Sequence, residues 1–589
     1  MVIRKILRRI IFGVISLTII GYFYFVLPLW GYPFNAQRHG NPPLTPAWAL
    51  ECWLWEDDVN NSDFVDELLA GYAERDIPVR TIIIDSPWSY RYNDFKIDTS
   101  LYHDPDRWFG KIQQDGYRVV LWMTTMVNGF NKDLELKNSE DWYEEARGKG
   151  FLAGGNSQNK WWKGKGGFID YTNPEAMTWW HGLQQHVFDL GIDGWKLDGT
   201  ATLFWSNLGP IPMFYKKTYA GLMTTRTYMD HYYRDEYQHA LTQNPEFATL
   251  SRAMDRGFHP EGFAPIDASP VNWVGDQEHK WITDEMIAGT GKDKIDIAMD
   301  GIEGFESAIK SILKSASSGY NIIGSDVAGF SGKTIPPRLY IRWTQFSAFC
   351  GLFMNGGHGE RRLWKRSAEE LEIIRQYSWL HTELVPYMYH YVATAHRGGQ
   401  RLQTPIDGKY HYLFGEDILV APIYKDDLKN EIHLPEGDWR YWFDDSKIIK
   451  GPVSFERQFP LNEYPLYIKE GAIIPMNIER PYTGIGVEAD SSFLTFRIYP
   501  NKKNSFEVFT ENAPSTLLAY EKSERDLQIN VSGEIRPHIL SITLSQKPTM
   551  VELDGKHLKE NEEFTYNAVT QKLKVVTATY ENGSYHIHW

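Results

Sequence analysis

The sequence predicts an α/β protein in which a (β/α)8 TIM barrel is followed by C-terminal antiparallel β-sandwich domains and preceded by an N-terminal transmembrane anchor. Three observations predict this fold class. Strand-like and helix-like segments alternate between about residues 46 and 390. Beyond about residue 395 the pattern changes to short alternating apolar runs that are divided by Gly, Pro, Asp and Asn. The first thirty residues combine a basic cluster with a long apolar run.

The composition is typical of a globular protein with several domains. A chain of 589 residues is too long for a single hydrophobic core, and 42% of its residues are hydrophobic. The net charge of −15 has no compensating basic stripe, which argues against a nucleic-acid partner. The two cysteines, Cys52 and Cys350, cannot form a disulfide framework, and no Cys/His cluster has the spacing of zinc ligands. We therefore expect neither a cofactor nor a bound metal.

The N-terminal segment predicts a single-pass signal anchor over residues 1–30. The basic residues are Arg4, Lys5, Arg8 and Arg9, and the apolar run extends from Ile10 to Trp30. A run of this length spans a bilayer as a helix. Because basic flanks stay in the cytoplasm, we expect the C-terminal mass on the periplasmic, extracellular or lumenal side of the membrane. A cleaved signal peptide is the alternative, although no clear small-x-small cleavage site follows the apolar run.

Residues 31–394 form the predicted barrel domain. Strands buried on both faces should be short, apolar and rich in β-branched or aromatic residues. Seven segments fit this description: Trp48–Trp55, Arg80–Ile84, Arg118–Met123, Gly194–Leu197, Val271–Val274, Asn321–Gly324 and Phe346–Met354. Helical segments lie between them, with start signals at Ser62 and Asn173 and stop signals at Gly191 and Gly319. Repeated βα units in this number predict a closed barrel.

The C-terminal part of the chain is predicted to be all-β. Short alternating runs include Asp417–Ala421, Glu431–Leu434, Tyr464–Ile468 and Ala472–Pro475. Such runs, bounded by turn residues, are typical of antiparallel sandwiches. We expect a proximal β-sandwich over residues 395–481 and a distal one over residues 482–589.

Four carboxylates follow predicted barrel strands directly. They are Asp85, Asp198, Asp276 and Asp326. Because barrel active sites lie at the carboxyl ends of the strands, we expect these side chains to converge on one pocket. Converging carboxylates suit glycoside hydrolysis, which needs a carboxylate and a carboxylic acid on either side of the scissile bond, and they also suit a divalent metal. For any single aspartate, a helix cap or a salt bridge is an equally good interpretation.

The order of several motifs resembles glycoside hydrolase family 31, whose members are retaining α-glycosidases and their relatives. In the barrel the motifs are GIDGWKLD at 191–198, WVGD at 273–276, GSDVAGF at 324–330 and GHGE at 357–360. Beyond the barrel, residues 414–422, 434–439 and 471–475 are similar to the family's sandwich segments. The resemblance covers about residues 46–480, and its specificity comes from the order and spacing of the motifs together.

The resemblance implies a role for each matching residue. Asp198 would be the nucleophile, and Asp276 would be the general acid/base of a double displacement through a glycosyl-enzyme. The implied substrate-binding residues are Asp85, Lys196, Arg252, Trp273, Asp326, Phe330, His358 and Trp122. Lys196 would also keep the neighbouring nucleophile ionised. The two tryptophans could equally be aromatic residues of the barrel core.

Four departures from the family pattern bear on the sugar. Barrel-like sequence begins almost directly after the anchor, without the usual preceding β-sandwich. The nucleophile strand continues to Gly199 rather than to a Glu, Thr125 lies where an acid is usual, and Gly356 lies where an Arg is usual. These changes alter contacts on one side of the pocket. We therefore expect a terminal α-linked sugar other than glucose, with α-galactoside first and an acidic sugar second, near Lys196 and Arg91; an ordinary α-glucosidase is the alternative.

Other classes of function remain open. The same scaffold supports transglycosylases and α-glucan lyases, which differ in their products. A non-catalytic carbohydrate-binding homologue would be expected to lack one of the two catalytic aspartates, and both are present. A metal-dependent hydrolase would lose activity with a chelator. The oligomeric state is left open by the sequence.

Overall fold

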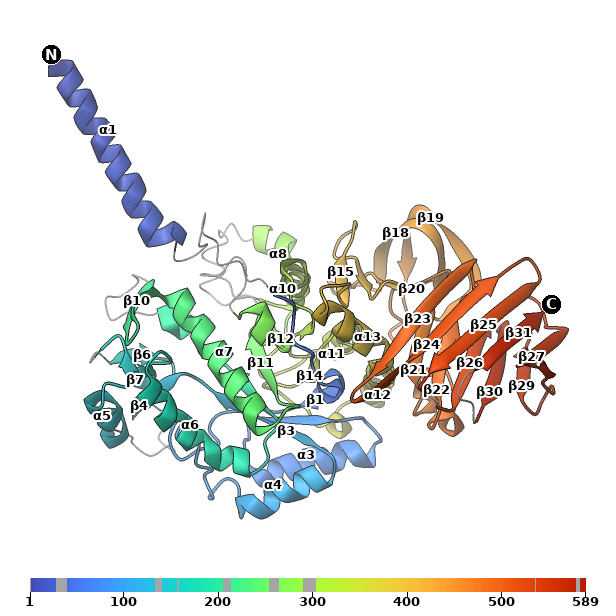
Figure 1. The fold of residues 1–589 in the computed structure, drawn as a ribbon, viewed down its shortest axis with the longest axis horizontal. Coiled ribbons are helices and arrows are strands. Elements are labelled where there is room, and N and C mark those ends of the chain that lie inside the picture. Colours follow the sequence, from blue (N-terminus) through green and yellow to red (C-terminus); the bar gives the residue numbers. More distant parts are fainter. Residues whose placement is uncertain are drawn as a thin grey trace. The chain divides into compact units, whose positions relative to one another are not determined.

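Figure 1 shows the computed structural model of the chain, which describes residues 2–27, 40–132, 140–155, 158–204, 213–253, 264–289, 303–534, 536–578 and 583–589. The chain divides into two compact units. The first consists of Met1–Pro43, Val59–Val65 and Ile83–Gly275, and the second of Leu44–Asp58, Asp66–Ile82 and Asp276–Trp589. Both units contribute strands to the barrel sheet.

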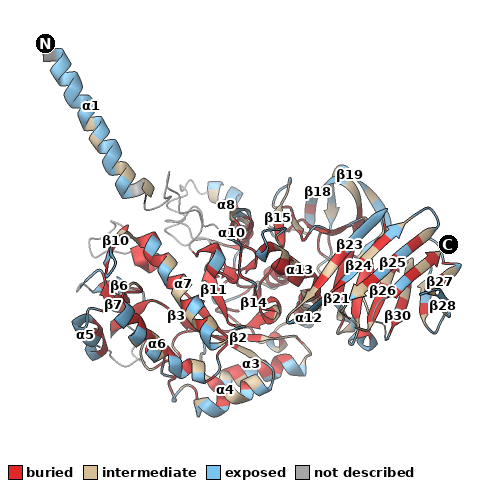
Figure 2. Ribbon diagram, viewed as in Figure 1, coloured by how far each residue is buried: buried red, intermediate tan, exposed pale blue. Residues whose placement is uncertain are grey.

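The predicted (β/α)8 barrel is confirmed by an eight-stranded sheet in the order β13-β12-β11-β8-β3-β2-β1-β14. Its strands are β1 Cys52–Leu54, β2 Thr81–Ile84, β3 Arg118–Met123, β8 Gly194–Leu197, β11 Ala248–Arg252, β12 Val271–Trp273, β13 Ile323–Gly324 and β14 Phe353–Asn355. The strands pair in parallel, with Lys196 opposite both Trp122 and Leu250. A parallel bridge between Asp326 and Met354 joins the two end strands, so the sheet closes on itself. Figure 2 shows the buried strands in red, as expected for a sheet covered on both faces.

Helices follow or cover the strands. They are α3 Ser62–Glu74, α4 Pro105–Gln114, α5 Glu140–Gly148, α6 Pro174–Asp189, α7 Thr225–Gln243, α8 Asp284–Gly289, α10 Phe305–Ser318, α11 Pro337–Ser347, α12 Ala368–Glu383 and α13 Val385–His396. The predicted signals at Asn173, Gly191 and Gly319 mark helix ends, whereas Ser62, predicted as a cap, is the first residue of its helix, and the side chain of Asn61 caps that helix by accepting from the backbone N–H of Phe64 at 2.9 Å. The side chain of Asn173 caps α6 by accepting from the backbone N–H groups of Glu175 and Ala176. Gly319 ends α10 with a φ of 113°, a conformation that a glycine adopts without strain.

Three strand predictions need correction. The β11 strand was not predicted, because its sequence ATLSR alternates polar and apolar residues and carries no long apolar run. Most of the segment predicted from Phe346 to Met354 is the end of α11 and a turn, and only its last two residues belong to β14. In the segment from Trp48 to Trp55, a 3₁₀ helix over Ala47–Leu50 precedes a three-residue strand.

Two small sheets are inserted after barrel strands of the first unit. The first contains β4 Met126–Asn131, β5 Leu152–Ala153, β6 Asn159–Trp161 and β7 Gly164–Ile169. The second is the hairpin of β9 Tyr215–Thr218 and β10 Gly221–Thr224. These insertions follow the carboxyl ends of β3 and β8, which is the end of a barrel where catalytic loops are found.

The C-terminal part forms three sheets, as expected for antiparallel β-domains. The first contains β15 Gln403–Pro405, β16 Tyr412–Phe414, β17 Ile418–Val420, β18 Lys429–Tyr441, β19 Asp444–Gln458 and β20 Leu466–Lys469. The second contains β21 Ile473–Asn477, β22 Leu494–Ile498, β26 His538–Thr543, β29 Phe564–Asn567 and β30 Lys572–Thr577. The third contains β23 Lys503–Thr510, β24 Ala513–Lys522, β25 Asp526–Gly533, β27 Met550–Leu553, β28 Lys556–His557 and β31 Gly583–His588. The pairing of β22 with β26 is parallel, and the other described pairings are antiparallel. The exact domain boundaries stay predictions.

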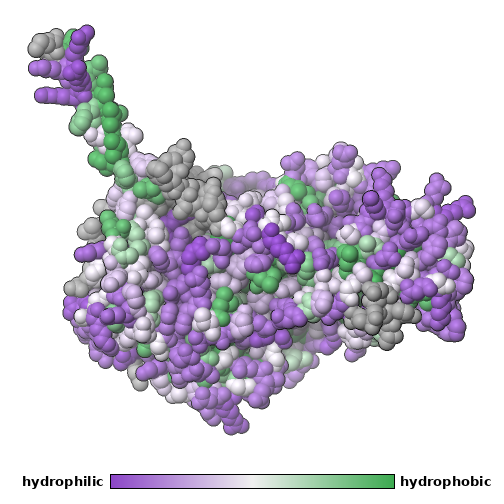
Figure 3. Space-filling model, in the orientation of Figure 1, coloured by the Kyte–Doolittle hydropathy of each residue, from purple (hydrophilic) through white to green (hydrophobic). Residues whose placement is uncertain are grey.

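The N-terminal segment is helical. The α-helix α1 Val2–Gly21 continues into a π-helical turn, Tyr22–Val26. The stretch Ile3–Tyr24 has 22 residues and a mean hydropathy of 1.8, so it is long and apolar enough to cross a membrane. Figure 3 shows its apolar side chains in green, with hydrophilic residues gathered at its N-terminal end. Residues 28–30 of the predicted anchor lie outside the described residues.

Candidate active site

The carboxylate of Asp198, at the end of β8, is held by donors from both neighbouring strands. Trp122 of β3 donates its indole N–H to Oδ2 at 3.1 Å, and Arg252 of β11 donates from Nη2 to Oδ1 at 3.2 Å. The backbone N–H of Gly199 also donates to Oδ1, at 2.8 Å. The Asp198 side chain is 18% exposed, so it is largely withdrawn from water while still accessible. Rigid strands therefore fix both oxygens of this carboxylate.

The surroundings of Asp198 favour its charged form. Burial acts to raise the pKa of Asp198, but the positive charges of Arg252 and Lys196, with the hydrogen bonds from Gly199 and Trp122, bring this pKa below its usual value. Arg252 has the larger effect of the two cations. A carboxylate that stays ionised at neutral pH is what nucleophilic attack requires.

Lys196 and Asp85 form a buried ion pair at the ends of β8 and β2. Lys196 Nζ lies 2.6 Å from Asp85 Oδ2, and the two side chains are 7% and 9% exposed. Asp85 Oδ1 accepts the backbone N–H of Ser86 at 2.7 Å. The ring of Trp273 faces both cations. Its centroid lies 5.8 Å from Lys196 Nζ and 4.8 Å from the central carbon of the Arg252 guanidinium. The first unit thus brings six predicted site residues into one cluster: Asp85, Trp122, Lys196, Asp198, Arg252 and Trp273.

In the second unit, Trp55 contacts two predicted site residues. Its indole Nε1 donates to Asp326 Oδ1 at 3.2 Å, and its ring stacks on Phe330 with centroids 5.8 Å apart. Trp55 also explains the unusual Gly356. A Cβ atom on residue 356 would lie 1.6 Å from Trp55 Cδ1, so the indole fills the space of any side chain there. The place where the family usually has an arginine is therefore occupied by a buried aromatic ring.

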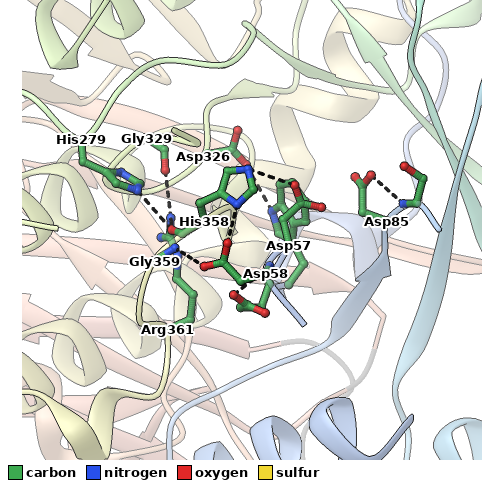
Figure 4. A network of polar contacts seen from close by, with 12 residues as sticks. Asp57, Asp58, Asp85, His279, Asp326, Gly329, His358, Gly359 and Arg361 are labelled. Atoms are coloured by element: carbon green, nitrogen blue, oxygen red, sulfur yellow. Dashed lines mark hydrogen bonds and ion pairs between the residues drawn. The ribbon is translucent and has the colours of Figure 1, made fainter. Parts of the chain in front are cut away.

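His358 lies between two carboxylates, as Figure 4 shows. Its Nδ1 is 2.7 Å from Asp58 Oδ1, and its Nε2 is 3.3 Å from Asp57 Oδ2. The backbone N–H of Gly359 donates to the other oxygen of Asp58 at 3.0 Å. The His358 ring also contacts Phe330, with centroids 4.8 Å apart. The orientation of the predicted substrate-binding histidine is thus fixed by acidic residues that follow β1.

Arg361 supports the backbone around this histidine. It is fully buried and donates to the carbonyl oxygen of Val327 at 2.6 Å. It also donates to the carbonyl oxygens of Gly329 at 2.9 Å and His358 at 3.0 Å (Figure 4). These bonds tie the loop after β13 to the loop after β14. Arg361 therefore stabilises the backbone of the two loops that carry Phe330 and His358.

Asp276 lies three residues beyond the end of β12 and is exposed. It begins the second unit, whereas Asp198 belongs to the first. The roles of Asp198 as nucleophile and Asp276 as acid/base stay predictions. So do the substrate contacts predicted for the other site residues.

Sequence reasoning missed Trp55, Asp57, Asp58 and Arg361. The first three belong to the run Trp55-Glu56-Asp57-Asp58, directly after β1. The strand-end rule that found Asp85 would have found this run, had the end of β1 been placed at Leu54. Arg361 gives no such signal, because a buried arginine that binds only carbonyl groups looks like a surface cation in the sequence.

Two family models match the chain in succession. The Glycosyl hydrolases family 31 TIM-barrel domain matches residues 42–391, and the Glycosyl hydrolase family 31 C-terminal domain matches residues 388–474. The first match alone covers more than half of the 589 residues.

Individual relatives are distant and longer. An alpha-xylosidase of Emericella nidulans is 24% identical over 471 residues, covering 75% of this chain and 55% of the relative. An isomaltosyltransferase of Sporosarcina globispora is 24% identical over 522 residues, covering 79% of this chain and 44% of the relative. The chain thus spans about half the length of these curated relatives. A family 31 dextranase of Flavobacterium johnsoniae, solved with isomaltotriose, has the same fold, with a TM-score of 0.78 at 21% identity over 93% of this chain and 72% of the other.

Proposed function

The chain belongs to glycoside hydrolase family 31, and from this premise we propose that it is a retaining, exo-acting α-glycosidase that hydrolyses a terminal α-linked sugar. The observation that carries the proposal is the carboxylate of Asp198. Nearby cations hold its pKa below the usual value despite burial, donors on β3 and β11 fix it, and it is still partly accessible at the carboxyl end of a barrel strand. That combination suits a nucleophile better than a structural salt bridge.

The reaction proceeds by two displacements. An Asp198 oxygen attacks the anomeric carbon while the glycosidic bond breaks, and the leaving oxygen takes a proton from the Asp276 carboxylic acid. The Asp276 carboxylate then removes a proton from water, which attacks the same carbon and frees Asp198. The exposure of Asp276 agrees with this role, because both the leaving group and the water must reach it. Two inversions at one carbon give net retention.

Transfer to another sugar is the second candidate activity. Curated relatives include an isomaltosyltransferase and a 1,6-alpha-glucosyltransferase, both from Sporosarcina globispora. The same glycosyl-enzyme serves either reaction, and the acceptor decides between them. Free sugar as the main product at high donor concentration indicates hydrolysis, whereas longer glycosides indicate transfer.

The contacts around the pocket residues favour a neutral sugar over an acidic one. Lys196 is bound to Asp85 and Arg252 is bound to Asp198, so each of these cations already faces a carboxylate. Arg91 is the other residue expected to bind an anion, and its Nη1 lies 3.5 Å from Asp141 Oδ1. We keep a terminal α-galactoside as the first substrate to test. The Trp55 ring fills the space that a side chain at residue 356 would need, which is one change of the pocket relative to the family pattern.

The apolar helix at the N-terminus suits a signal anchor. Its length and hydropathy fit a single membrane span, and the four basic residues precede it. The positive-inside rule then gives a cytoplasmic N-terminus and a catalytic domain on the periplasmic, extracellular or lumenal side.

Azide rescue of catalytic variants tests the proposal. With an α-glycosyl fluoride as donor, Asp198→Ala should lose turnover by at least about 10⁴-fold and regain part of it with azide, forming the β-glycosyl azide. Asp276→Ala should instead yield the α-glycosyl azide, because the nucleophile is still present. Asp267→Ala, which removes an exposed aspartate paired with Arg234, is the matched control and should keep turnover. Wild-type turnover in Asp198→Ala would exclude the assigned mechanism.

A further inference from the structure

A second hollow in the first unit lies outside the cluster around Asp198. It is formed by the loop after β2, by the start of α4, and by helices α5 and α6, which lie side by side in Figure 1. It consists of a cavity of about 440 Å³ and a cavity of about 500 Å³. Both are lined by Tyr90, Asp94, Lys96 and Leu183, so the two form one continuous groove. None of these four residues was predicted to belong to the catalytic site, although Arg91, which also lines the groove, was expected near an acidic sugar.

Asp94 is the unusual residue of this groove. It is 6% exposed, yet among the described residues no side chain forms a hydrogen bond or an ion pair with its carboxylate. The backbone N–H of Lys96 donates to Oδ1 at 3.1 Å. Burial raises the pKa of Asp94 to about 6 against the opposing effect of backbone hydrogen bonds and of the charges on Arg91 and Lys96. A carboxylate held by backbone donors alone can accept further hydrogen bonds from a ligand.

The loop presents Asp94 rigidly. Asn93 and Phe95, on either side, both have positive φ angles, of 62° and 55°. Asn93 is bound to Thr124 and to the carbonyl of Met126, at 2.9 and 2.7 Å. Phe95 is fully buried in aromatic contacts with the barrel core. Because its two neighbours are anchored inward, Asp94 is held at the lining of the groove.

Aromatic rings form much of the remaining wall. Trp142 of α5 and Trp179 of α6 pack together with centroids 5.5 Å apart, and Tyr90 closes the loop side. Tyr90 and Trp179 are half-buried, so part of each ring is open to solvent. The charged residues of the wall are two cations, Arg91 and Lys96, and three acids, Asp94, Asp106 and Glu145. Apolar ring faces beside a few fixed polar groups are the usual design of a small-ligand site.

We propose that this groove is a second carbohydrate-binding site, which takes a neutral pyranose unit of an oligosaccharide. Sugar hydroxyls supply the donors that the Asp94 carboxylate lacks, and the C–H faces of the ring pack on Trp179 and Tyr90. The acids of the wall outnumber its cations by one, which disfavours an anionic sugar. The site binds without catalysing, and its existence does not depend on the catalytic roles given to Asp198 and Asp276.

Counting binding sites tests the proposal on the full chain in detergent micelles. The Asp198→Ala background prevents turnover, and titration calorimetry uses maltotriose, isomaltotriose and raffinose separately. At least one of the three sugars should bind at an Asp94-dependent site. Asp94→Asn keeps the side-chain volume and the oxygen that accepts from Lys96 N, and it should weaken that binding at least tenfold. Asp115→Asn, an aspartate at the C-terminus of α4 outside the groove lining, is the matched control and should bind as the background does.

Kinetics separate this site from the catalytic one. In the chain with Asp198 intact, Asp94→Asn should leave kcat and KM for a small aryl α-glycoside unchanged and raise KM for a longer oligosaccharide. Failure of the catalytic proposal would appear as wild-type turnover in Asp198→Ala. The KM comparison of Asp94→Asn with Asp115→Asn in the chain with Asp198 intact then still tests the second site. Equal affinity and stoichiometry in the Asp94→Asn and Asp115→Asn variants, for all three sugars, would overturn the second site.

Discussion

At the scale of single residues, the protonation state of Asp198 depends on cations from adjacent strands. Arg252 is the strongest of the influences that lower the pKa of Asp198. In Arg252→Gln we expect this pKa to rise, because burial then acts with less opposition. The acid limb of kcat/KM against pH should therefore move to higher pH, and kcat/KM at the optimum should fall by about 10²-fold or more.

The control for this prediction is Arg234→Gln. Arg234 is an arginine of α7 that pairs with Asp267 at the surface, and its loss should leave the acid limb in place. An unchanged acid limb in Arg252→Gln would show that Arg252 does not set the protonation of the group that governs this limb.

Gly356 offers a second test at this scale. Its φ lies outside the left-handed region, so alanine is conformationally allowed, but the added Cβ would collide with the buried Trp55 ring. Gly356→Ala should destabilise the protein by about 1–3 kcal/mol through overpacking. In a Trp55→Ala background the same substitution should cost little, because removal of the indole ring leaves room for the added Cβ atom. Thermal unfolding of the four variants measures this coupling, and equal penalties in both backgrounds would contradict the account.

Part of this site could be predicted from the sequence. Asp85 and Asp198 follow buried strands directly, so their position needed only the strand pattern. The partners of His358 could not be predicted in this way, because Asp58 is 300 positions away along the chain. Their contact results from the parallel pairing of β1 with β14, and a single sequence does not reveal which strands are neighbours.

At the scale of elements, local signals predicted helices better than strands. The α6 helix begins after Asn173 and ends before Gly191, and α10 ends at Gly319, as predicted, since caps are satisfied within a few residues of chain. The β11 strand was missed because the first unit buries its polar residues as well, with Thr249 and Ser251 both at 0% exposure. Burial of that kind depends on neighbouring elements rather than on the strand's own sequence.

The contact between α6 and α7 contains a buried acid whose titration is testable. Glu236 accepts hydrogen bonds from Tyr171, Trp180 and Gln184, and burial raises its pKa to about 7. Between about pH 4.5 and pH 7 the folded chain holds a proton here that the unfolded chain releases, so this group lowers stability as pH rises. Glu236→Gln, which stays neutral, should gain in unfolding temperature relative to wild type from pH 5 to pH 8. A difference that stays constant over this range would contradict the assignment.

At the scale of the whole molecule, the orientation in the membrane can be tested directly. In the proposed orientation the basic N-terminal flank lies in the cytoplasm, so protease added to intact cells or spheroplasts that express the full chain should cleave the catalytic domain. Replacing Arg4, Lys5, Arg8 and Arg9 with Glu should reduce this exposure in a fraction of the molecules. Complete protection of the wild-type catalytic domain, with cleavage only after lysis, would reverse the orientation.

The sequence pattern predicted the overall architecture of the barrel and of the C-terminal sheets, but it did not predict all of their strand pairings. Alternating βα units predicted the barrel, and the change of pattern near residue 395 predicted the all-β part. The pattern did not predict that β21 and β22 would pair across residue 481, because register and sheet membership depend on contacts between distant strands.

Trapping the glycosyl-enzyme tests the central claim most directly. A 5-fluoro-α-glycosyl fluoride of the preferred sugar should inactivate the enzyme by forming an ester that hydrolyses slowly, and peptide mass spectrometry then identifies the labelled residue. We predict one sugar per chain, attached to Asp198 in the peptide that contains residues 191–198. A label on any other residue, or an inverted anomer as the first product with no labelled peptide, would contradict the mechanism.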